Sequence, residues 1–424
     1  MSEFLYQQAM NAFSGAMKMA TLFSPKIKLG VEGRKGLIEK LKAVLPGLIE
    51  TRPVVWFHAA SLGEFEQGRP VMEQFRKEFP DYFILLTFFS PSGYEIRKNY
   101  SGADYVCYMP LDTAKNARDF VEIIKPEITF FIKYEFWYNH LAVLKNSGSR
   151  ILSFSTIFRP DQIFFKTYGG FYRKMLRYFD HLFVQNEESL KLMHQINISA
   201  CSLAGDTRFD RVRSIASSVR QLPEIESFLH NFPCLVAGSV WEADMVELIP
   251  ALNQAEQPLK AIIAPHEIEK NQMENWRKSL SGKSMLYSEY KKLFDAFAEI
   301  QPFDYLIIDN IGMLSSLYRY SDIAYIGGSF GSGLHNILEA ATFGVPILFG
   351  NKKYQKFQEA LDLIEEGSAK AASDTNEIKL YLTEWINEPA KRKILGVISE
   401  NYVASQTGAT ELVMKKVRDI LGSK

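Results

Sequence analysis

The sequence predicts an α/β protein made of two doubly wound domains, each with a parallel sheet covered by helices on both faces. From residue 54 onwards, short and almost wholly apolar runs alternate with longer amphipathic runs. Apolar strands separated by helices are typical of parallel sheets that are buried on both faces. The alternation gives way to a more polar stretch after residue 212 and starts again at residue 234. This restart indicates two domains of the same kind, with a boundary near residues 205–230.

Six apolar runs in the first half are expected strands, and three of the segments between them are expected helices. The expected strands are 54–60, 83–89, 105–110, 128–133, 150–155 and 181–185. The expected helices are 64–79, a segment after residue 93, and 114–124. Ligands of such sheets bind at the carboxyl ends of the strands, so the residues that follow each strand are the candidate functional residues.

Five apolar runs continue the pattern in the second half. They are 234–239, 259–265, 305–309, 323–328 and 345–350. We therefore expect three parts, namely an N-terminal amphipathic segment (1–30), a first domain (31–210) and a second domain (211–424). The last helix of the chain is a candidate for packing back on the first domain. Two domains of this kind that face each other enclose a cleft for ligands.

The composition argues against several classes of protein. Lys and Arg together number 49, as do Asp and Glu, whereas a general nucleic-acid-binding protein is usually basic. The three cysteines, Cys107, Cys201 and Cys234, are far apart and have no CxxC spacing. A disulfide framework or a zinc cluster is therefore not expected, and a reducing cytosol is the natural compartment.

The N-terminal segment from Phe4 to Phe23 has features of a helix that lies on a membrane. An apolar stripe at helical spacing is formed by Met10, Phe13, Met17 and Ala20. Polar residues interrupt the segment, so it is not expected to span a bilayer. Six Lys and Arg residues follow between positions 26 and 42. This combination favours contact with an anionic membrane surface, and the alternative is a helix that packs on its own protein.

A glycine loop between a strand and a helix is a candidate anion site. Four glycines fall within Gly327–Gly333. Leu334-His335 replaces the Lys-Ser/Thr of an ATP-binding P-loop, and Asn336 replaces the third glycine of a dinucleotide fingerprint. Neither template fits, but free N–H groups of the loop and of a helix at about 335–343 would favour an anion. The alternative is a tight turn before an ordinary capped helix.

Two pairs of polar residues add detail to this interpretation. Asn336 and Glu339 lie one turn apart on the same helix face, where the carboxylate is expected to accept hydrogen bonds from ribose hydroxyls. In the first half, Ser61 and Glu64 have the spacing of a capping box. Glu64 is either a helix cap only or a general base whose pKa is raised by burial.

A second carboxylate and a lysine follow another strand of the first half. Glu135 is flanked by aromatic residues, and Lys133 is nearby. A single glutamate at a strand end is usually solvated. Two carboxylates at the carboxyl edge of one sheet, Glu64 and Glu135, are a candidate acid–base site.

Six stretches of the sequence occur together in the order found in one known family. They are WFHAASLGEFEQGRPV, KYEFWYN, GDTRFD, AGSVWEAD, APHEIEK and YIGGSFGSGLHNILEAATFGVPILFG. In these stretches the chain resembles the 3-deoxy-D-manno-octulosonic acid (Kdo) transferases of lipopolysaccharide biosynthesis, over nearly its whole length. The resemblance implies a glycosyltransferase B-type fold, with two facing Rossmann-like doubly wound domains and an interdomain cleft.

The resemblance also implies an activity and a location. The family moves Kdo from CMP-Kdo to a glucosamine hydroxyl of the lipid A precursor (lipid IVA), at the cytoplasmic face of the bacterial inner membrane. The first domain then binds the lipid acceptor and the second domain binds CMP. No metal ion, no other cofactor and no nucleic acid are implied. Direct displacement predicts inversion at the anomeric carbon.

The resemblance assigns roles to individual residues. The family's proton acceptor falls on Glu64, a second functional carboxylate on Glu135, and a lysine that assists the transition state on Arg208. Contacts to the acceptor fall on Ser61, Gly63 and Lys133. Contacts to CMP fall on Ser239, Pro265, His266, Ile311, Gly312, Met313, Gly328, Ser329, Asn336, Ile337, Leu338 and Glu339.

Three positions depart from the family pattern. Arg208 keeps the charge of the lysine but not its geometry. His266 stands in place of an arginine that contacts CMP, so this phosphate contact is expected to be weaker or pH-dependent. Met313 replaces an acidic residue, so only backbone contacts are implied there. Asn336 and Glu339 match the family pattern fully.

Two alternative functions belong to different classes. One is another nucleotide-sugar enzyme of the same fold, either a transferase that uses a UDP-sugar or an epimerase. The other is a catalytically silent membrane-associated binding protein. The carboxylates Glu64 and Glu135 and the pair Asn336 and Glu339 argue against a silent protein.

Overall fold

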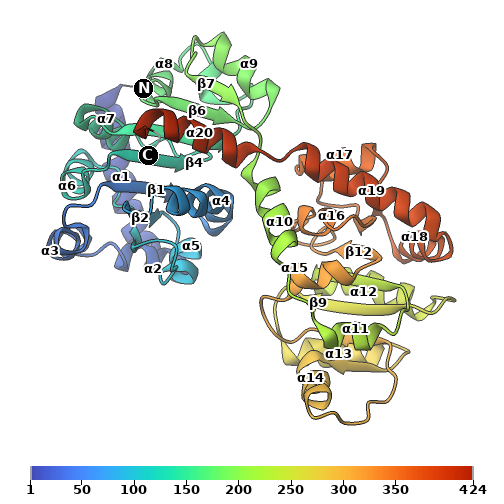
Figure 1. The fold of residues 1–424 in the computed structure, drawn as a ribbon. Coiled ribbons are helices and arrows are strands. Elements are labelled where there is room, and N and C mark those ends of the chain that lie inside the picture. The colour runs from blue at the N-terminus through green and yellow to red at the C-terminus, as the bar shows by residue number, and fades with distance from the viewer. Residues whose placement is uncertain (1, 423–424) are drawn as a thin grey trace. The chain divides into compact units, whose positions relative to one another are not determined.

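The computed structural model describes residues 2–422 and divides them into two compact units (Figure 1). The first unit contains the described residues up to Arg211 and those from Thr407 onwards. The second unit is Val212–Gln406. Each unit has one sheet of seven strands, and every strand pairing in both sheets is parallel.

The strand order of the first unit is β3-β2-β1-β4-β5-β6-β7. Its strands are β1 (Val54–Ala59), β2 (Phe83–Phe88), β3 (Tyr105–Tyr108), β4 (Ile128–Ile132), β5 (Arg150–Thr156), β6 (His181–Val184) and β7 (Cys201–Leu203). The chain builds outward from β1 in one direction and then from β4 in the other. The order therefore reverses between β1 and β4, which is the point at which doubly wound sheets bind ligands.

The second unit repeats this arrangement in the order β10-β11-β9-β8-β12-β13-β14. Its strands are β8 (Cys234–Val240), β9 (Lys260–Pro265), β10 (Ser284–Leu286), β11 (Tyr305–Ile307), β12 (Ile323–Ile326), β13 (Ile347–Gly350) and β14 (Ala369–Ala372). The reversal lies between β8 and β12. The strands β7, β10 and β14 were not predicted from the sequence, because their residues, CSL, SML and AKAA, form no apolar run.

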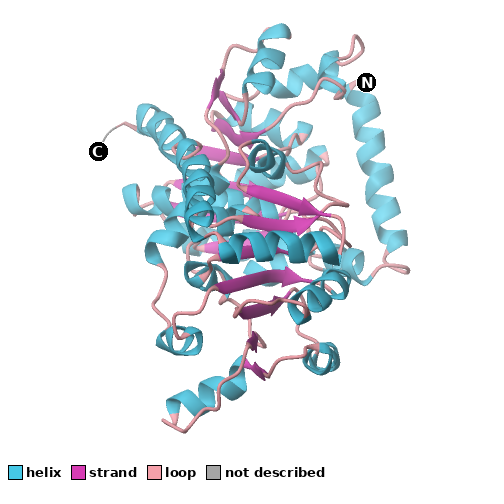
Figure 2. Ribbon diagram, turned by 90° about the vertical axis from the view of Figure 1, so that its right-hand side faces the viewer, coloured by secondary structure: helices cyan, strands magenta, loops and turns pink. Residues whose placement is uncertain are grey.

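Helices connect the strands and cover the sheets (Figure 2). Those of the first unit are α1 (Glu3–Ala20), α2 (Pro25–Glu32), α3 (Leu37–Ile49), α4 (Leu62–Glu78), α5 (Pro91–Arg97), α6 (Ala114–Ile124), α7 (Tyr138–Ser147), η1 (Ile163–Phe165), α8 (Gly170–Leu176), α9 (Glu187–Gln195) and α20 (Ala409–Leu421). Helix α10 (Thr207–Ser218) crosses the boundary. Those of the second unit are α11 (Pro223–Leu229), α12 (Glu242–Asn253), α13 (Lys270–Ser279), α14 (Tyr287–Asp295), α15 (Leu314–Leu317), η2 (Tyr318–Tyr320), α16 (Leu338–Ala341), α17 (Gln358–Glu365), α18 (Thr375–Asn387) and α19 (Pro389–Ser405).

The sheet of the first unit separates two apolar cores, because successive strand residues point to opposite faces. On one face, Trp56 of β1 packs edge-on against Phe120 of α6, with ring centroids 5.0 Å apart. On the other face, Phe57 stacks on Phe130 of β4 at 4.6 Å. The second core is completed by buried residues of α20, which lies against the first unit (Figure 1).

Helix α1 packs on the first unit through Tyr6 and Met10, which are both buried. The Tyr6 hydroxyl donates to the buried Asp112 carboxylate at 2.6 Å. Of the predicted apolar stripe, Met10 is buried and Phe13 is exposed, so contact of this helix with a membrane stays a prediction. The large apolar side chains exposed on α1 and the turn after it are Phe4, Leu5, Phe13, Met19, Leu22 and Phe23. None of the helices in residues 2–422 is both long and apolar enough to span a membrane.

Candidate active site

Glu64 lies beside the point where the first sheet reverses its strand order. Strand β1 ends at Ala59, and Ser61 caps α4 by accepting a hydrogen bond from the Glu64 N–H at 3.5 Å. In return, the Ala60 N–H donates to Glu64 Oε2 at 2.5 Å. The predicted Ser61 cap is therefore present, although the return hydrogen bond comes from Ala60, the residue before the cap. It places the glutamate one turn into the helix, with one carboxylate oxygen held by the backbone.

The environment of Glu64 favours the protonated form. Burial, followed by the negative charge of Glu135, raises the pKa of Glu64 to about 7. The Ala60 N–H and the Lys133 ammonium act in the opposite direction but do not cancel the effect. A carboxylate with a pKa near neutrality accepts a proton and releases it again at physiological pH, as a general base must. Capping and base chemistry are thus compatible in one residue.

Glu135 follows β4 on the other side of the reversal point and is buried. One of its carboxylate oxygens, Oε2, accepts hydrogen bonds from the Trp137 indole N–H at 2.6 Å and from His58 Nε2 at 3.1 Å. The sheet thus brings together Glu64 and Glu135, which are far apart in the sequence.

A buried chain of donors leads to Glu135. The Trp56 indole donates to Thr87 Oγ1 at 2.8 Å, and Thr87 Oγ1 lies 2.8 Å from His58 Nδ1. Burial lowers the pKa of His58, so its ring is neutral and carries one proton. Because the Glu135 carboxylate only accepts, that proton lies on Nε2, and Nδ1 accepts from the Thr87 hydroxyl. The order Trp56, Thr87, His58, Glu135 is therefore fixed in one direction.

The predicted acceptor contacts lie in the same region. Lys133 immediately follows β4 and adopts a left-handed backbone conformation with φ of 69°. Its charge reaches Glu64, whose pKa it lowers. The Ser61 hydroxyl accepts the cap hydrogen bond. Gly63 is exposed, and a Cβ atom added to it would have no other atom within 4 Å.

Arg208 lies in the first turn of α10, within the first unit. Its Nε donates to Asp206 Oδ2 at 2.7 Å, and its backbone N–H donates to Asp206 Oδ1 at 2.9 Å. The Gln67 side-chain amide also donates to both oxygens of Asp206, each at 3.1 Å. The partly exposed guanidinium thus forms an ion pair with the buried Asp206 carboxylate. The sequence alone did not indicate this pair.

The glycine loop follows β12 at the reversal point of the second sheet. The Gly328 N–H donates to Asp244 Oδ2 at 2.8 Å. The Gly331 and Gly333 N–H groups donate to the Gly328 carbonyl at 3.0 and 2.8 Å. These three N–H groups have acceptors within the protein, and contact of the loop with the phosphate of CMP stays a prediction. Gly328 and Gly333 have φ of 95° and 130°, which explains why glycine is needed there.

Asp244 is the anion around which this loop folds. Its carboxylate also accepts from the Trp241 N–H at 2.9 Å and from the Tyr325 hydroxyl at 3.3 Å. Burial raises the pKa of Asp244, and the N–H groups of Gly328 and Trp241 oppose that effect. The glycine loop therefore does bind a carboxylate, but that carboxylate is Asp244 of the chain itself.

The helix after the loop is shorter than predicted. It begins at Leu338 and not at His335, and α16 has four residues. A dipole from so short a helix is small, so the predicted contribution of a helix N-terminus is not supported. Asn336 and Glu339 do meet as predicted, since Asn336 Nδ2 donates to Glu339 Oε1 at 3.0 Å. The other oxygen of Glu339 accepts from the Ser315 hydroxyl at 2.9 Å.

Three rings are stacked beside the glycine loop. His266 lies against Trp241, with centroids 4.5 Å apart, and against His335 at 4.3 Å. The Trp241 indole N–H donates to His335 Nε2 at 2.9 Å. Burial, and then the neighbouring His266, lower the pKa of His335 to about 4. The neutral His335 therefore carries its proton on Nδ1, and the exposed His266 ring is positioned as a π-stacked donor or acceptor.

The other predicted CMP contacts are distributed unevenly over the second unit. Ser239 lies at a bulge in β8 with φ of 54°, and Pro265 ends β9. The Ser329 side chain is buried and donates to the Gly350 carbonyl. The side chains of Ile337 and Leu338 are also buried, so these three residues offer only backbone atoms.

The remaining contacts lie before α15. Ile311 is 93% exposed. Gly312 and Met313 line a cavity of about 410 Å³ that also includes Arg220. This cavity lies wholly within the second unit.

Sequence reasoning missed four residues of these sites: His58, Asp244, Trp241 and His335. Trp241 offers no side-chain acceptor for a helix cap, so the sequence carries no capping-box signal that would single out Asp244. His58 sits inside an apolar strand and looked like a core residue.

In comparisons with known proteins, the chain is similar to 3-deoxy-D-manno-octulosonic acid transferases. A family model described as 3-deoxy-D-manno-octulosonic-acid transferase (kdotransferase) matches residues 31–211. The 3-deoxy-D-manno-octulosonic acid transferase of Chlamydophila psittaci is 26% identical over 359 residues, which cover 83% of this chain and 81% of that protein. The transferase of the same name from Aquifex aeolicus is 24% identical over 368 residues, which cover 84% of this chain and 93% of that protein.

Two solved structures establish the fold. A UDP-GlcNAc 2-epimerase from Neisseria meningitidis superposes with a TM-score of 0.60 at 13% identity, over 86% of this chain and all of that one. Acinetobacter baumannii MurG superposes with a TM-score of 0.55 at 13% identity, over 87% and 99% of the two chains. These likenesses, with two parallel seven-stranded sheets, confirm the predicted glycosyltransferase B-type fold. The family model and the relatives, which are similar to this chain over most of its length, indicate a glycosyltransferase that is similar to the Kdo transferases.

Proposed function

We propose that this protein transfers Kdo from CMP-Kdo to a glucosamine hydroxyl of a lipid A precursor, with inversion at the anomeric carbon. The observation that carries the proposal is the placement of Glu64 and Glu135 on either side of the reversal point of the first sheet, where Glu64 has a pKa of about 7. Similarity to the Kdo transferases supports Kdo as the transferred sugar.

The proposed reaction is a single displacement. Glu64 takes the proton from the acceptor hydroxyl while the hydroxyl oxygen forms a bond to the anomeric carbon of Kdo. The bond from that carbon to the phosphate oxygen of CMP breaks, and CMP leaves with the electron pair. Positive charge develops on the sugar, as in other glycosyl transfers. One displacement inverts the configuration.

Glu135 supports the base in this proposal. Its negative charge raises the proton affinity of Glu64, and the developing positive charge on the sugar is favoured near two carboxylates. The donors from Trp137 and His58 hold the Glu135 carboxylate in one orientation.

The second unit is proposed to hold the donor. Asn336 and Glu339 present an amide oxygen and a carboxylate to the ribose hydroxyls, and their mutual hydrogen bond fixes their orientation. His266 and His335 are proposed to contact the phosphate in place of the family's arginine. Arg208 is proposed to stabilise charge on the leaving phosphate, together with these imidazoles.

The first unit is proposed to hold the acceptor through Ser61, Gly63 and Lys133, and to lie on the cytoplasmic face of the inner membrane. Exposed apolar side chains on α1, such as Phe4 and Phe13, support a membrane contact. The proposal includes no metal ion, no other cofactor and no nucleic acid.

The direct test is incubation of the purified protein with CMP-Kdo and lipid IVA, with products separated and weighed by mass spectrometry. A product heavier than the acceptor by one or more Kdo residues, with release of CMP, is expected. Protection against thermal unfolding by CMP but not by UDP would separate this function from that of a UDP-sugar enzyme. Protection by UDP alone would contradict the proposal.

A further inference from the structure

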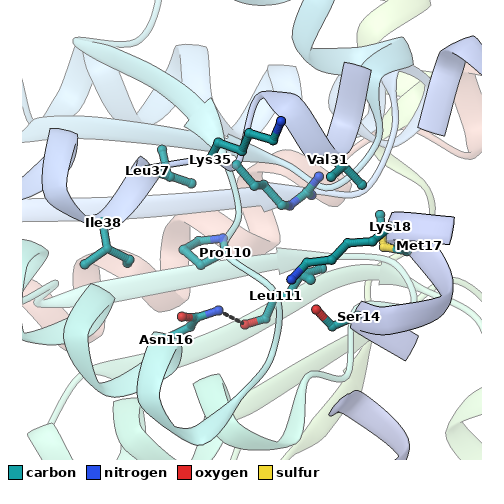
Figure 3. Close-up of a pocket in the computed structure, with 11 residues that line it drawn as sticks. Ser14, Met17, Lys18, Val31, Lys35, Leu37, Ile38, Pro110, Leu111 and Asn116 are labelled. Carbon is teal, nitrogen blue, oxygen red and sulfur yellow. Dashed lines mark hydrogen bonds between the residues drawn. The ribbon is translucent and has the colours of Figure 1, made fainter. Parts of the chain in front are cut away.

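The first unit contains a cavity of about 390 Å³ between α1, the segment from α2 to α3, and the loop that follows β3 (Figure 3). It is lined by Ser14, Met17, Lys18, Val31, Arg34, Lys35, Leu37, Ile38, Pro110, Leu111 and Asn116. Three of these residues are cationic, and none is acidic. The cavity is therefore electropositive, although the whole chain has equal numbers of acidic and basic residues.

Arg34 is the least exposed of the three cations. Its guanidinium donates to the carbonyls of Gly30 at 2.8 Å, Phe89 at 2.6 Å and Met109 at 2.8 Å. Among the described residues, no carboxylate lies within ion-pair distance of it. Burial lowers its pKa to about 10, which still leaves the group charged. The three carbonyls and the rings of Phe89 and Tyr108, each 4.8 Å from Arg34 Cζ, hold the guanidinium in place, so it gives the cavity a fixed positive charge.

The rest of the lining combines two further cations with an apolar wall. Lys18 reaches across the cavity from α1 (Figure 3). Neither Lys18 nor Lys35 has a carboxylate within ion-pair distance among residues 2–422. Methyl and methylene groups of Met17, Val31 and Leu37 line the cavity as well. Inorganic phosphate would use the cations but leave this wall uncovered.

We propose that this cavity binds the phosphate head group of an anionic membrane phospholipid, with the first part of its acyl chains against the apolar wall. Lys18 is followed on α1 and its turn by the exposed apolar residues Met19, Leu22 and Phe23. A lipid bound beside these residues fixes α1 at a membrane surface. The inference extends the membrane contact proposed above. Its test reads lipid binding and not transfer, so the two proposals can fail separately.

The test uses the full chain and short-chain lipids below their micelle concentration, so that no membrane surface is present. Dihexanoyl phosphatidylglycerol has both charge and tails, dihexanoyl phosphatidylcholine has tails without net charge, and glycerol 3-phosphate has charge without tails. Titration calorimetry is expected to give phosphatidylglycerol an affinity at least about tenfold above either of the others. Equal affinities, or no saturable binding of phosphatidylglycerol, would overturn the proposal.

Variants locate the site. K18A/K35A removes two cations of the cavity, and K26A/K28A removes two exposed lysines of α2 that do not line it. The first pair is expected to weaken phosphatidylglycerol binding about tenfold and the second to leave it unchanged. Equal losses would show diffuse attraction and not a site. All four lysines are exposed, so folding should be retained, and unfolding temperatures check this.

A third variant and a competing ligand complete the test. Val31→Phe fills the cavity without changing its charge, so it should abolish binding. Unchanged affinity in this variant would place the lipid elsewhere. Binding of lipid IVA but not of phosphatidylglycerol would assign the cavity to the acceptor and would also overturn the proposal.

Discussion

His58 Nε2 donates to Glu135 Oε2 at 3.1 Å, from an imidazole that no solvent reaches. This bond ends a chain of buried donors and fixes the carboxylate whose charge raises the pKa of Glu64. Burial raises the pKa of Glu64 most, and the second contribution comes from a carboxylate that residues of the sheet interior hold in place. The predictions below test this arrangement and its counterpart in the second unit.

Replacing Glu64 by Gln should lower the rate of transfer about 10²–10⁴-fold, which is the usual contribution of a general base. Gln keeps the shape and the hydrogen bond from the Ala60 N–H, so CMP binding should be unchanged. The matched control is Glu66→Gln on the same helix, where Glu66 pairs with Arg97. We expect the control to retain activity. Near-normal transfer by the Glu64→Gln variant would show that Glu64 is not the general base.

The pH dependence of kcat/KM should show an acid limb with a midpoint near 7. Glu64 is protonated below its pKa of about 7 and cannot accept the acceptor's proton, so activity rises as pH increases through that value. In Glu135→Gln the negative charge that raises this pKa is absent. The midpoint of the residual activity should then move to lower pH, and a midpoint that stays near 7 would show that Glu135 is not the cause.

Glu64→Gln should also stabilise the fold above neutral pH. The pKa of Glu64 is about 7 in the folded protein and 4.5 in the absence of the folded environment, as in the unfolded chain. The folded state therefore binds the proton more tightly than the unfolded state does. Stability therefore falls as pH rises from about 4.5 to 7, by at most about 3 kcal/mol. Glutamine at this position does not ionise, so the stability of the Glu64→Gln variant does not fall in this way. Its unfolding temperature should exceed that of the parent at pH 8 and be similar at pH 4, and the reverse order would contradict the assignment.

Thr87→Val should test the chain of donors that ends at Glu135. The change preserves shape but leaves the Trp56 N–H and His58 Nδ1 without a partner, at a cost of about 1–3 kcal/mol. His58 is then free to change tautomer, so transfer should fall and its acid limb should shift. The control is Thr129→Val in the same sheet, which removes the buried hydrogen bond to Ser149. A similar loss of stability without a change in the pH profile is expected for that control.

Asp244→Ala should disorganise the glycine loop of the second unit. The buried Gly328 and Trp241 N–H groups lose their acceptor, which should cost at least about 2 kcal/mol. The loop and the Trp241–His266–His335 stack share these contacts, so CMP should bind more weakly in calorimetric titrations. Val246→Ala, an exposed change on the same helix, is the control. Unchanged CMP affinity in the Asp244 variant would separate the loop from donor binding.

The predicted architecture and the identity of the proposed base came from strong local signals. The alternation of apolar runs found eleven of the fourteen strands, because a strand buried on both faces has no polar interruption. The capping-box spacing placed Glu64 at a helix start beside a strand end. Both signals lie within a few residues of the chain.

The missed features depend on pairings that are distant in sequence. His58 joins Glu135 across 77 positions, and Gly328 joins Asp244 across 84. No local sequence pattern predicts which carboxylate a loop will enclose. The glycines therefore indicated a bound anion, but not whether that anion is a ligand or a side chain of the protein. The predicted helix at 335–343 is wrong at its start, because residues 335–337 continue the loop, where the His335 N–H bonds to the Gly327 carbonyl, and α16 begins at Leu338.

Helix α20 has a consequence for the order in which the protein matures. Its residues Val413, Met414 and Val417 are buried in a core that β1 and β4 share. These residues are synthesised long after the strands that they cover. The sheet of the first unit therefore exposes an apolar face on the ribosome until α20 follows, and a chaperone is the natural temporary partner for that face.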